Sequence, residues 1–224
     1  MRLVVFDVDG TLINSQHEIV QAMNQGMLDA GLPEMEPRRI LSIVGLSLPV
    51  AVAHLLPGGG PDLVARVVQG YRDAFVAARA AGAVPPLYPG ARDCLELLAS
   101  QERVFLGIAT GKPMRGLIAI LDAHGLSGHF VTRQTADGHP SKPHPAMLES
   151  ALAEAGVAPA RAVMIGDTSF DMEMARGAGV AGFGVDWGYH PAADLHAAGA
   201  ALVAPDFPAL TQAVMDWTRT EHPA

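Results

Sequence analysis

From about residue 91 onward the chain alternates short apolar runs with segments of helical pattern, and this alternation limits the possible folds more than any other feature. The apolar runs cover residues 104–109, 130–132, 162–165, 181–185 and 201–203. Strands that alternate with helices predict a parallel sheet covered on both faces and joined by right-handed crossovers. Residues 1–14 begin with another apolar run and predict one more strand. We therefore expect an α/β fold built on one parallel sheet.

A helical block interrupts this pattern between the first strand and the remaining ones. Ser15 and Glu18 predict a capping box at the start of a helix, and apolar residues follow at helical spacing. A second amphipathic pattern covers residues 63–75, and a turn-rich segment at 85–90 ends the block. We expect an all-helical insertion over residues 15–85 within one α/β domain formed by residues 1–14 and 86–224.

Composition excludes several classes of protein. With 50% hydrophobic and 17% charged residues in 224, the chain can bury a substantial core, and a net charge of -8 disfavours nucleic acid as a partner. The single cysteine, Cys94, cannot form an internal disulfide. A strand pattern starts within two residues of Met1, and proline and glycine interrupt the uncharged stretch 40–61. We expect a cytoplasmic protein with no signal peptide and no membrane span.

Two aspartates stand where the first apolar run ends. Asp7 and Asp9 are separated by one residue, so they leave an extended segment on the same side. Gly10 then permits a turn that a side chain would obstruct. Charges at the end of a buried strand are costly and commonly serve chemistry. The pair therefore suggests a bound cation, or a division between nucleophilic attack and proton transfer.

Other polar residues follow later strands. Thr110 and Gly111 end one apolar run, Asp167 ends another, and Asp171 and Lys142 lie near helix starts. The carboxyl ends of parallel strands share one edge of a sheet, so these side chains are expected to converge there. Carboxylate oxygens suit Mg²⁺, whereas a hydroxyl, backbone N–H groups and a lysine suit a phosphoryl group. The combination predicts phosphoryl transfer.

The chain resembles the haloacid dehalogenase superfamily in its magnesium-dependent phosphatase branch. The matching motifs occur in the family's order: residues 7–11, Thr110, Lys142, and residues 166–167 with Asp171. The resemblance implies a Rossmann-like core with an inserted helical cap of the C1 type, matching residues 15–85. Residues 109–112, 142–145 and 185–190 also resemble phosphoglycolate phosphatase-like enzymes. This narrower resemblance makes 2-phosphoglycolate the leading candidate among small phosphate esters.

The resemblance also implies a role for each motif residue. Asp7 would attack phosphorus to form an aspartyl-phosphate, and Asp9 would act first as acid and then as base. Lys142 would neutralise charge between Asp7 and the phosphoryl group, which Thr110 and the Gly111 N–H would also bind. Mg²⁺ would be held by Asp7, the Asp9 carbonyl and Asp167, with Asp171 acting directly or through water.

Recognition of the rest of the substrate is assigned to less specific positions. Arg39, Gly45 and His144 are the candidates, with Gly45 resembling a cap-loop glycine and Arg39 available for a second anionic group. Trp187 and Tyr189, after the 181–185 strand, are interpreted as packing residues. The oligomeric state stays open between monomer and homodimer.

Three other functions compete with hydrolysis of a phosphate ester. A phosphosugar mutase of the β-phosphoglucomutase type uses the same two aspartates, but Thr11 favours hydrolysis because those mutases usually have valine there. A dehalogenase would need no metal, and Asp9 argues against it. A non-catalytic module that binds a phosphometabolite is disfavoured by the intact motif residues.

Overall fold

Parallel strands form a single sheet in the computed structural model, which describes residues 1–220. Within these residues the sheet has six strands in the order β3-β2-β1-β4-β5-β6. The strands are β1 (Arg2–Phe6), β2 (Val104–Thr110), β3 (Phe130–Thr135), β4 (Ala162–Gly166), β5 (Ala181–Val185) and β6 (Leu202–Ala204). The predicted α/β class and parallel sheet are confirmed. β3 is longer than its apolar run because polar residues of its second half pair with β2.

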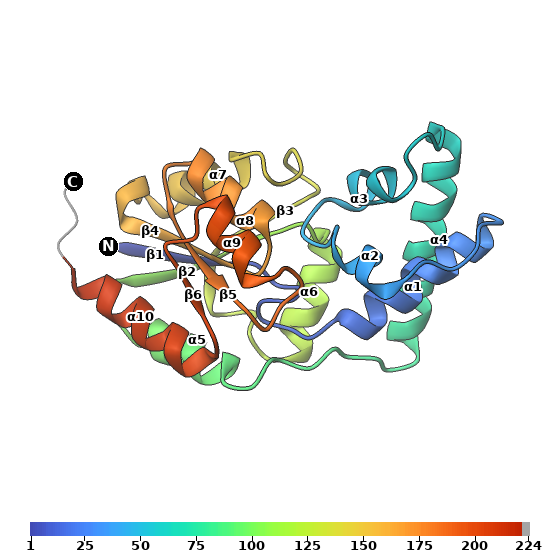
Figure 1. The fold of residues 1–224 in the computed structure, drawn as a ribbon. Helices are drawn as coiled ribbons and strands as arrows, with labels where there is room; N and C mark the ends of the chain where they lie inside the picture. The colour runs from blue at the N-terminus through green and yellow to red at the C-terminus, as the bar shows by residue number, and fades with distance from the viewer. Residues whose placement is uncertain (221–224) are drawn as a thin grey trace.

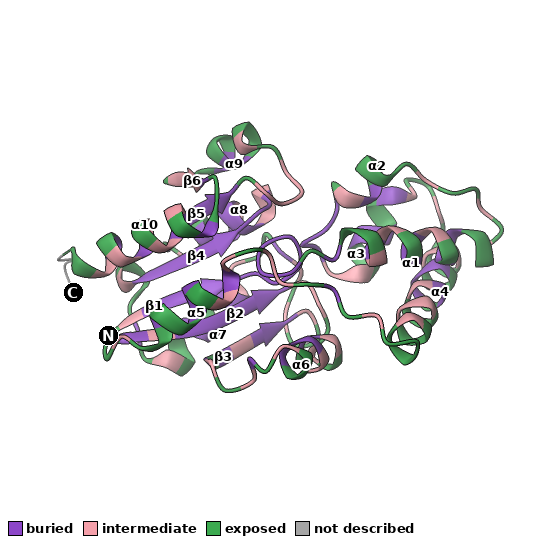
Figure 2. Cartoon of the chain, turned by 90° about the horizontal axis from the view of Figure 1, so that it is seen from below, coloured by how far each residue is buried: buried purple, intermediate pink, exposed green. Residues whose placement is uncertain are grey.

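Helices cover both faces of the sheet (Figure 1). They are α5 (Ala91–Ala99), α6 (Met114–Ala123), α7 (Ala146–Ala155), α8 (Ser169–Gly177), α9 (Ala192–Ala198) and α10 (Phe207–Arg219), with the 3₁₀ turn η1 (Pro159–Arg161) before β4. Successive residues of β1 point to opposite faces, so Val4 and Phe6 pack with α5, α6 and α10, while Leu3 and Val5 pack with α7 and α8. Figure 2 shows the central strands as buried, which explains their continuous apolar sequence.

The strand order places the end of β1 at the switch point of the sheet. β1 lies between β2 and β4, with Phe6 level with Ile108 and Ile165. The backbone N–H of Asp7 still donates to the Ile165 carbonyl at 2.9 Å. In open α/β sheets, ligands bind outside the carboxyl ends of the strands at this point. The first aspartate therefore leaves the sheet where a binding site is expected.

The helices between β1 and α5 gather beyond the carboxyl edge of the sheet, at one end of the molecule (Figure 1). We call them the helical insertion: α1 (Gln16–Asp29), α2 (Pro37–Leu41), α3 (Leu48–Leu55) and α4 (Pro61–Ala80). They share an apolar cluster that includes Met27, Ile40 and Val67. α1 and α4 cross closely at two glycines, because a Cβ on Gly26 would lie 2.6 Å from the Val67 carbonyl oxygen and one on Gly70 would lie 2.8 Å from the Gly26 Cα.

One local prediction in this region is wrong. Among the described residues, no side-chain hydrogen bond caps the start of α1, although Ser15 occupies the N-cap position. The Ser15 hydroxyl donates instead to the carboxylate of Asp9. A capping box is found at α8, where Thr168 and Asp171 exchange hydrogen bonds.

The uncharged stretch 40–61 is divided among short helices. It contains the end of α2, all of α3 and the loop that leads into α4. Within residues 1–220, no helix has both the length and the apolar character needed to cross a bilayer.

Candidate active site

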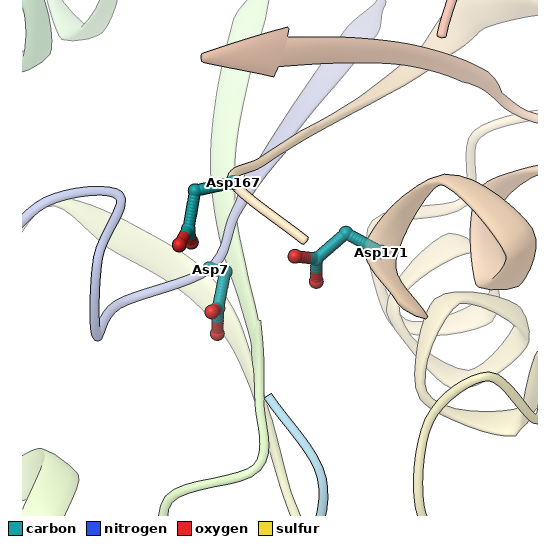
Figure 3. Close-up of side chains that lie close together, drawn as sticks. All are labelled: Asp7, Asp167 and Asp171. Atoms are coloured by element: carbon teal, nitrogen blue, oxygen red, sulfur yellow. The ribbon is translucent and has the colours of Figure 1, made fainter. Parts of the chain in front are cut away.

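Three carboxylates meet at the carboxyl edge of the sheet. Asp7 follows β1, Asp167 follows β4, and Asp171 lies in the first turn of α8; Figure 3 shows how near they lie. One oxygen from each lies within 4.8 Å of the others, and all three residues are buried. The structure therefore brings together three of the residues that the sequence predicts at one site.

The donor atoms of this acidic centre fit a hard divalent cation. Asp7 is only 1% exposed, yet its Oδ2 accepts no hydrogen bond from any residue in the described range. A buried carboxylate oxygen without a partner is costly unless something else binds it. Mg²⁺ takes oxygen ligands and is commonly held by one or two carboxylates together with water and substrate phosphate. Asp7 and Asp167 can supply those carboxylates.

Lys142 provides the positive charge inside the centre. Its ammonium lies 3.0 Å from Asp7 Oδ1 and 2.6 Å from Asp171 Oδ1, and its side chain is fully buried. Burial alone would lower the pKa of this lysine, but attraction to Asp171 and Asp7 outweighs it and raises the pKa. Lys142 therefore stays charged and compensates part of the buried negative charge.

Two of the carboxylates, Asp7 and Asp167, hold their protons more tightly than usual. Burial raises the pKa of Asp7 to about 6, although the Lys142 charge acts in the opposite direction. Burial, followed by repulsion from Asp171 and Asp7, raises the pKa of Asp167 well above its ordinary value. A cation bound between these groups would relieve the repulsion and favour their ionised forms.

The Asp171 carboxylate accepts hydrogen bonds from other protein groups, whether or not it contacts a metal. Its Oδ2 accepts hydrogen bonds from the Thr168 backbone N–H at 3.1 Å and from the Thr168 hydroxyl at 2.7 Å. Its Oδ1 accepts a hydrogen bond from Lys142. Both oxygens are thus engaged in starting α8 and in holding Lys142, an arrangement that favours an indirect contribution of Asp171 to metal binding.

Asp167 is held from two sides. The Thr11 hydroxyl donates to its Oδ1 at 2.8 Å, and the Tyr189 backbone N–H donates to its Oδ2 at 2.9 Å. The loop after β5 approaches so closely that a Cβ on Gly188 would lie 2.1 Å from the Asp167 Cβ. Residue 188 must therefore be glycine for this loop to reach Asp167.

Asp9 lies beside the centre and has its own partners. Its Oδ1 accepts a hydrogen bond from the Ser15 hydroxyl at 2.6 Å, and its Oδ2 lies 3.0 Å from the Lys112 ammonium. The Tyr189 hydroxyl lies 3.1 Å from the Ser15 hydroxyl. Sequence reasoning missed all three of these residues as members of the site. Lys112 follows β2, Tyr189 follows β5 and Ser15 follows the first motif. These positions were the available signal for a place in the site, because all three lie at the same edge of the sheet.

The segment after β2 forms the boundary between this site and the helical insertion. Thr110 is buried, and its hydroxyl accepts a hydrogen bond from the Lys112 backbone N–H at 3.3 Å. A Cβ on Gly111 would lie 2.5 Å from the Gly45 carbonyl oxygen. Gly45 has a φ of +102°, and a Cβ there would lie 3.1 Å from the Thr168 hydroxyl. Gly45 and Gly111 are therefore brought together, as expected of residues near one site.

The other two predicted recognition residues, Arg39 and His144, are exposed and make local hydrogen bonds. Arg39 is exposed on α2, and its guanidinium donates to the Leu55 carbonyl at the end of α3 at 2.8 Å. His144 is exposed, and its ring accepts a hydrogen bond from the Ala146 backbone N–H at 3.2 Å. Both side chains stabilise local helix structure, and their predicted contact with substrate stays a prediction.

The fold and this centre define an α/β enzyme with a buried acidic site at the switch point and a helical insertion after the first strand. Comparison with known proteins makes the assignment specific. The chain belongs to the haloacid dehalogenase-like hydrolase family, whose model matches residues 4–185. The family resemblance seen in the motifs is confirmed.

Individual relatives agree with this assignment. The chain is 37% identical over 202 residues to "Probable phosphatase IndB" of Dickeya dadantii (strain 3937), covering 88% of this chain and 86% of that protein. It is 32% identical over 222 residues to a phosphoglycolate phosphatase of Pseudomonas putida, covering 96% and 80% of the two chains. The crystal structure of a hydrolase from Pseudomonas syringae superposes with a TM-score of 0.85 at 25% identity, covering 96% of this chain and 99% of that one.

Proposed function

We propose that this protein is a magnesium-dependent phosphatase that hydrolyses a small phosphorylated metabolite through an aspartyl-phosphate, with 2-phosphoglycolate as the best single candidate. The observation that carries the proposal is the environment of the Asp7 carboxylate. Its carboxylate is buried at the switch point, pairs with Lys142 through one oxygen and has no hydrogen-bond partner for the other within the described chain. That oxygen is available to a cation or to phosphorus.

In the first half-reaction, Asp7 attacks phosphorus and the bond between phosphorus and the ester oxygen breaks. Asp9 gives a proton to that oxygen, so the alcohol leaves uncharged. In the second half-reaction, a water attacks the aspartyl-phosphate while Asp9 takes a proton from it. Inorganic phosphate leaves, and both aspartates return to their starting states.

Other residues stabilise charge during these steps. Lys142 lies 3.0 Å from Asp7 and would offset the charge that develops on the phosphoryl oxygens. The Thr110 hydroxyl and the Gly111 N–H would bind two of those oxygens. Asp7, the Asp9 carbonyl and Asp167 would hold Mg²⁺, with support from Asp171. When bound, the cation supplies positive charge that lessens repulsion between the anionic nucleophile and the anionic phosphate.

The position of Lys112 favours a substrate that carries a second negative charge. Its ammonium lies 3.0 Å from Asp9 Oδ2 and 5.5 Å from the centre of the Phe75 ring on α4. In 2-phosphoglycolate a single carbon separates the carboxylate from the ester oxygen that Asp9 would protonate. A substrate carboxylate would therefore lie within reach of Lys112. The name of the Pseudomonas putida relative agrees with the same substrate.

The test is phosphate release from a panel of phosphorylated metabolites and p-nitrophenyl phosphate. We expect turnover with Mg²⁺, none after chelation with EDTA, and none in Asp7→Asn, whose fold is checked by circular dichroism. Isomerisation of a sugar phosphate without phosphate release would instead identify a mutase. Tight binding of a phosphometabolite without turnover of any compound would identify a binding module. Activity of Asp7→Asn near that of the wild type would refute the nucleophile assignment.

A further inference from the structure

A chain of hydroxyl groups leads to the carboxylate of Asp9. The Ser15 hydroxyl donates to Asp9 Oδ1 at 2.6 Å, and the Tyr189 hydroxyl lies 3.1 Å from the Ser15 oxygen. A serine hydroxyl has a single proton to donate. Because Ser15 gives that proton to Asp9, Tyr189 must be the donor to Ser15. The order is therefore Tyr189 to Ser15 to Asp9.

We propose that Ser15 and Tyr189 are positioning residues that fix the carboxylate of Asp9 for proton transfer. Ser15 donates to Oδ1, so the oxygen that exchanges the proton with the leaving group and then with water is Oδ2, whose neighbour in this structure is the Lys112 ammonium at 3.0 Å. This inference rests on the proposed phosphatase function, because it concerns the orientation of the acid and base of that reaction.

The surroundings of Ser15 favour this role over a purely structural one. Ser15 stands at the N-cap of α1, where a serine ordinarily accepts a hydrogen bond from the first turn of the helix. Its hydroxyl accepts no hydrogen bond from those backbone N–H groups and donates to Asp9. The residue is fully buried, and its hydroxyl contacts protein groups, Asp9 and Tyr189.

Tyr189 contacts both the acidic centre and the hydrogen-bond chain that leads to Asp9. Its backbone N–H donates to Asp167 Oδ2 at 2.9 Å, while its hydroxyl reaches Ser15 and, through it, Asp9. The ring lies against the first motif, because a Cβ on Gly10 would lie 2.8 Å from the Tyr189 Cε2. Tyr189 thus holds Asp167 in the acidic centre through its backbone N–H and positions the acid-base residue Asp9, through Ser15, with its side chain.

The experiment uses the dependence of rate on the leaving group. An alkyl alcohol is a poor leaving group that needs the proton from Asp9, whereas p-nitrophenolate leaves readily without it. Tyr189→Phe and Ser15→Ala are compared with the wild type by kcat/KM, on p-nitrophenyl phosphate and on the best alkyl phosphate of the panel. We expect kcat/KM for the alkyl ester to fall about tenfold in Ser15→Ala, which loses a hydrogen bond to a charged group, and about fivefold in Tyr189→Phe, which loses one to a neutral hydroxyl. The aryl ester should lose less than about twofold in either variant.

Tyr88→Phe is the matched control, because the Tyr88 ring contacts the Trp187 ring in the same region, with centroids 6.2 Å apart and planes tilted by 55°, and this contact does not depend on the hydroxyl. It should leave both substrates unchanged. Equal losses on both esters in Tyr189→Phe, or the same selective loss in Tyr88→Phe, would overturn the inference while leaving the phosphatase intact. A wild-type protein that hydrolyses neither ester would overturn the proposed function and the inference with it.

Discussion

Replacing Asp7 by asparagine should stabilise the metal-free protein while abolishing turnover. The Asp7 carboxyl is 1% exposed, and burial outweighs the attraction of Lys142, so its pKa rises from the ordinary 3.8 to about 6. At neutral pH the native state must therefore hold an ionised group that its surroundings disfavour. Asparagine has nearly the same shape as the protonated acid and carries no charge.

The size of the effect follows from the pKa difference. Between pH 4 and 6 the unfolded chain has released the Asp7 proton while the native protein still holds it, so stability falls as pH rises through this window. One pKa unit corresponds to about 1.4 kcal/mol, and the difference between 3.8 and about 6 corresponds to on the order of 3 kcal/mol. For a chain of this size, that shifts Tm by roughly 6–12 °C.

The assay is urea or thermal unfolding in EDTA at pH 7 and at pH 4. Asp7→Asn should exceed the wild type at pH 7 by on the order of 3 kcal/mol, and the two proteins should approach each other at pH 4. Asp186→Asn, at an exposed position after β5, is the control and should change stability by less than about 0.5 kcal/mol. Added Mg²⁺ should stabilise the wild type more than Asp7→Asn.

The reasoning would be refuted by an Asp7→Asn protein that is no more stable than the wild type at pH 7 in EDTA. A gain of equal size at pH 4 and pH 7 would also contradict it, because the titration of Asp7 would then not be its source. Active sites commonly contain buried charged groups that the reaction requires and that lower the stability of the folded protein.

Three other substitutions test the roles of neighbouring residues. Lys142→Met should lower the free energy of unfolding by about 3–5 kcal/mol in urea titrations, because it leaves two buried carboxylates without their cation; a loss below about 1 kcal/mol would contradict this. Lys112→Met should raise KM for 2-phosphoglycolate by about tenfold without raising that for p-nitrophenyl phosphate; equal changes would remove Lys112 from substrate recognition. Gly188→Ala should weaken Mg²⁺ activation of phosphate release, since its Cβ would lie 2.1 Å from that of Asp167. Its control is Gly138→Ala, where a Cβ meets nothing within 4 Å; similar Mg²⁺ dependence in both variants would refute the close approach.

Periodicity in the sequence was sufficient for the fold class. The alternation of apolar runs and helical segments predicted a parallel α/β sheet because each pattern reports which face of an element is buried. The runs gave each strand to within a few residues, although the end of β3 was missed because its last residues are polar. Topology then explains why Asp7 and Asp167 meet and why Thr110 lies at the same edge, since all three stand at the carboxyl ends of strands of one parallel sheet.

The sequence was less informative where a side chain had a choice of partners. The spacing of Ser15 and Glu18 matched a capping box, but local spacing does not show that the serine hydroxyl donates to the Asp9 carboxylate and makes no cap hydrogen bond to the helix. Tyr189 was interpreted as a packing residue for the same reason. Its contacts with Ser15 and Asp167 span 174 and 22 residues of chain.

The sequence by itself determined the layered fold and predicted a helical segment after the first strand and motif residues at the strand ends, because these depend on local pattern and on the shared direction of parallel strands. Only the tertiary structure decided how those residues are held. It paired Lys142 with two carboxylates, left one oxygen of Asp7 without a partner among residues 1–220, and joined Tyr189, Ser15 and Asp9 in one chain of hydrogen bonds. Most of these contacts join segments far apart in the chain, and no local pattern records them.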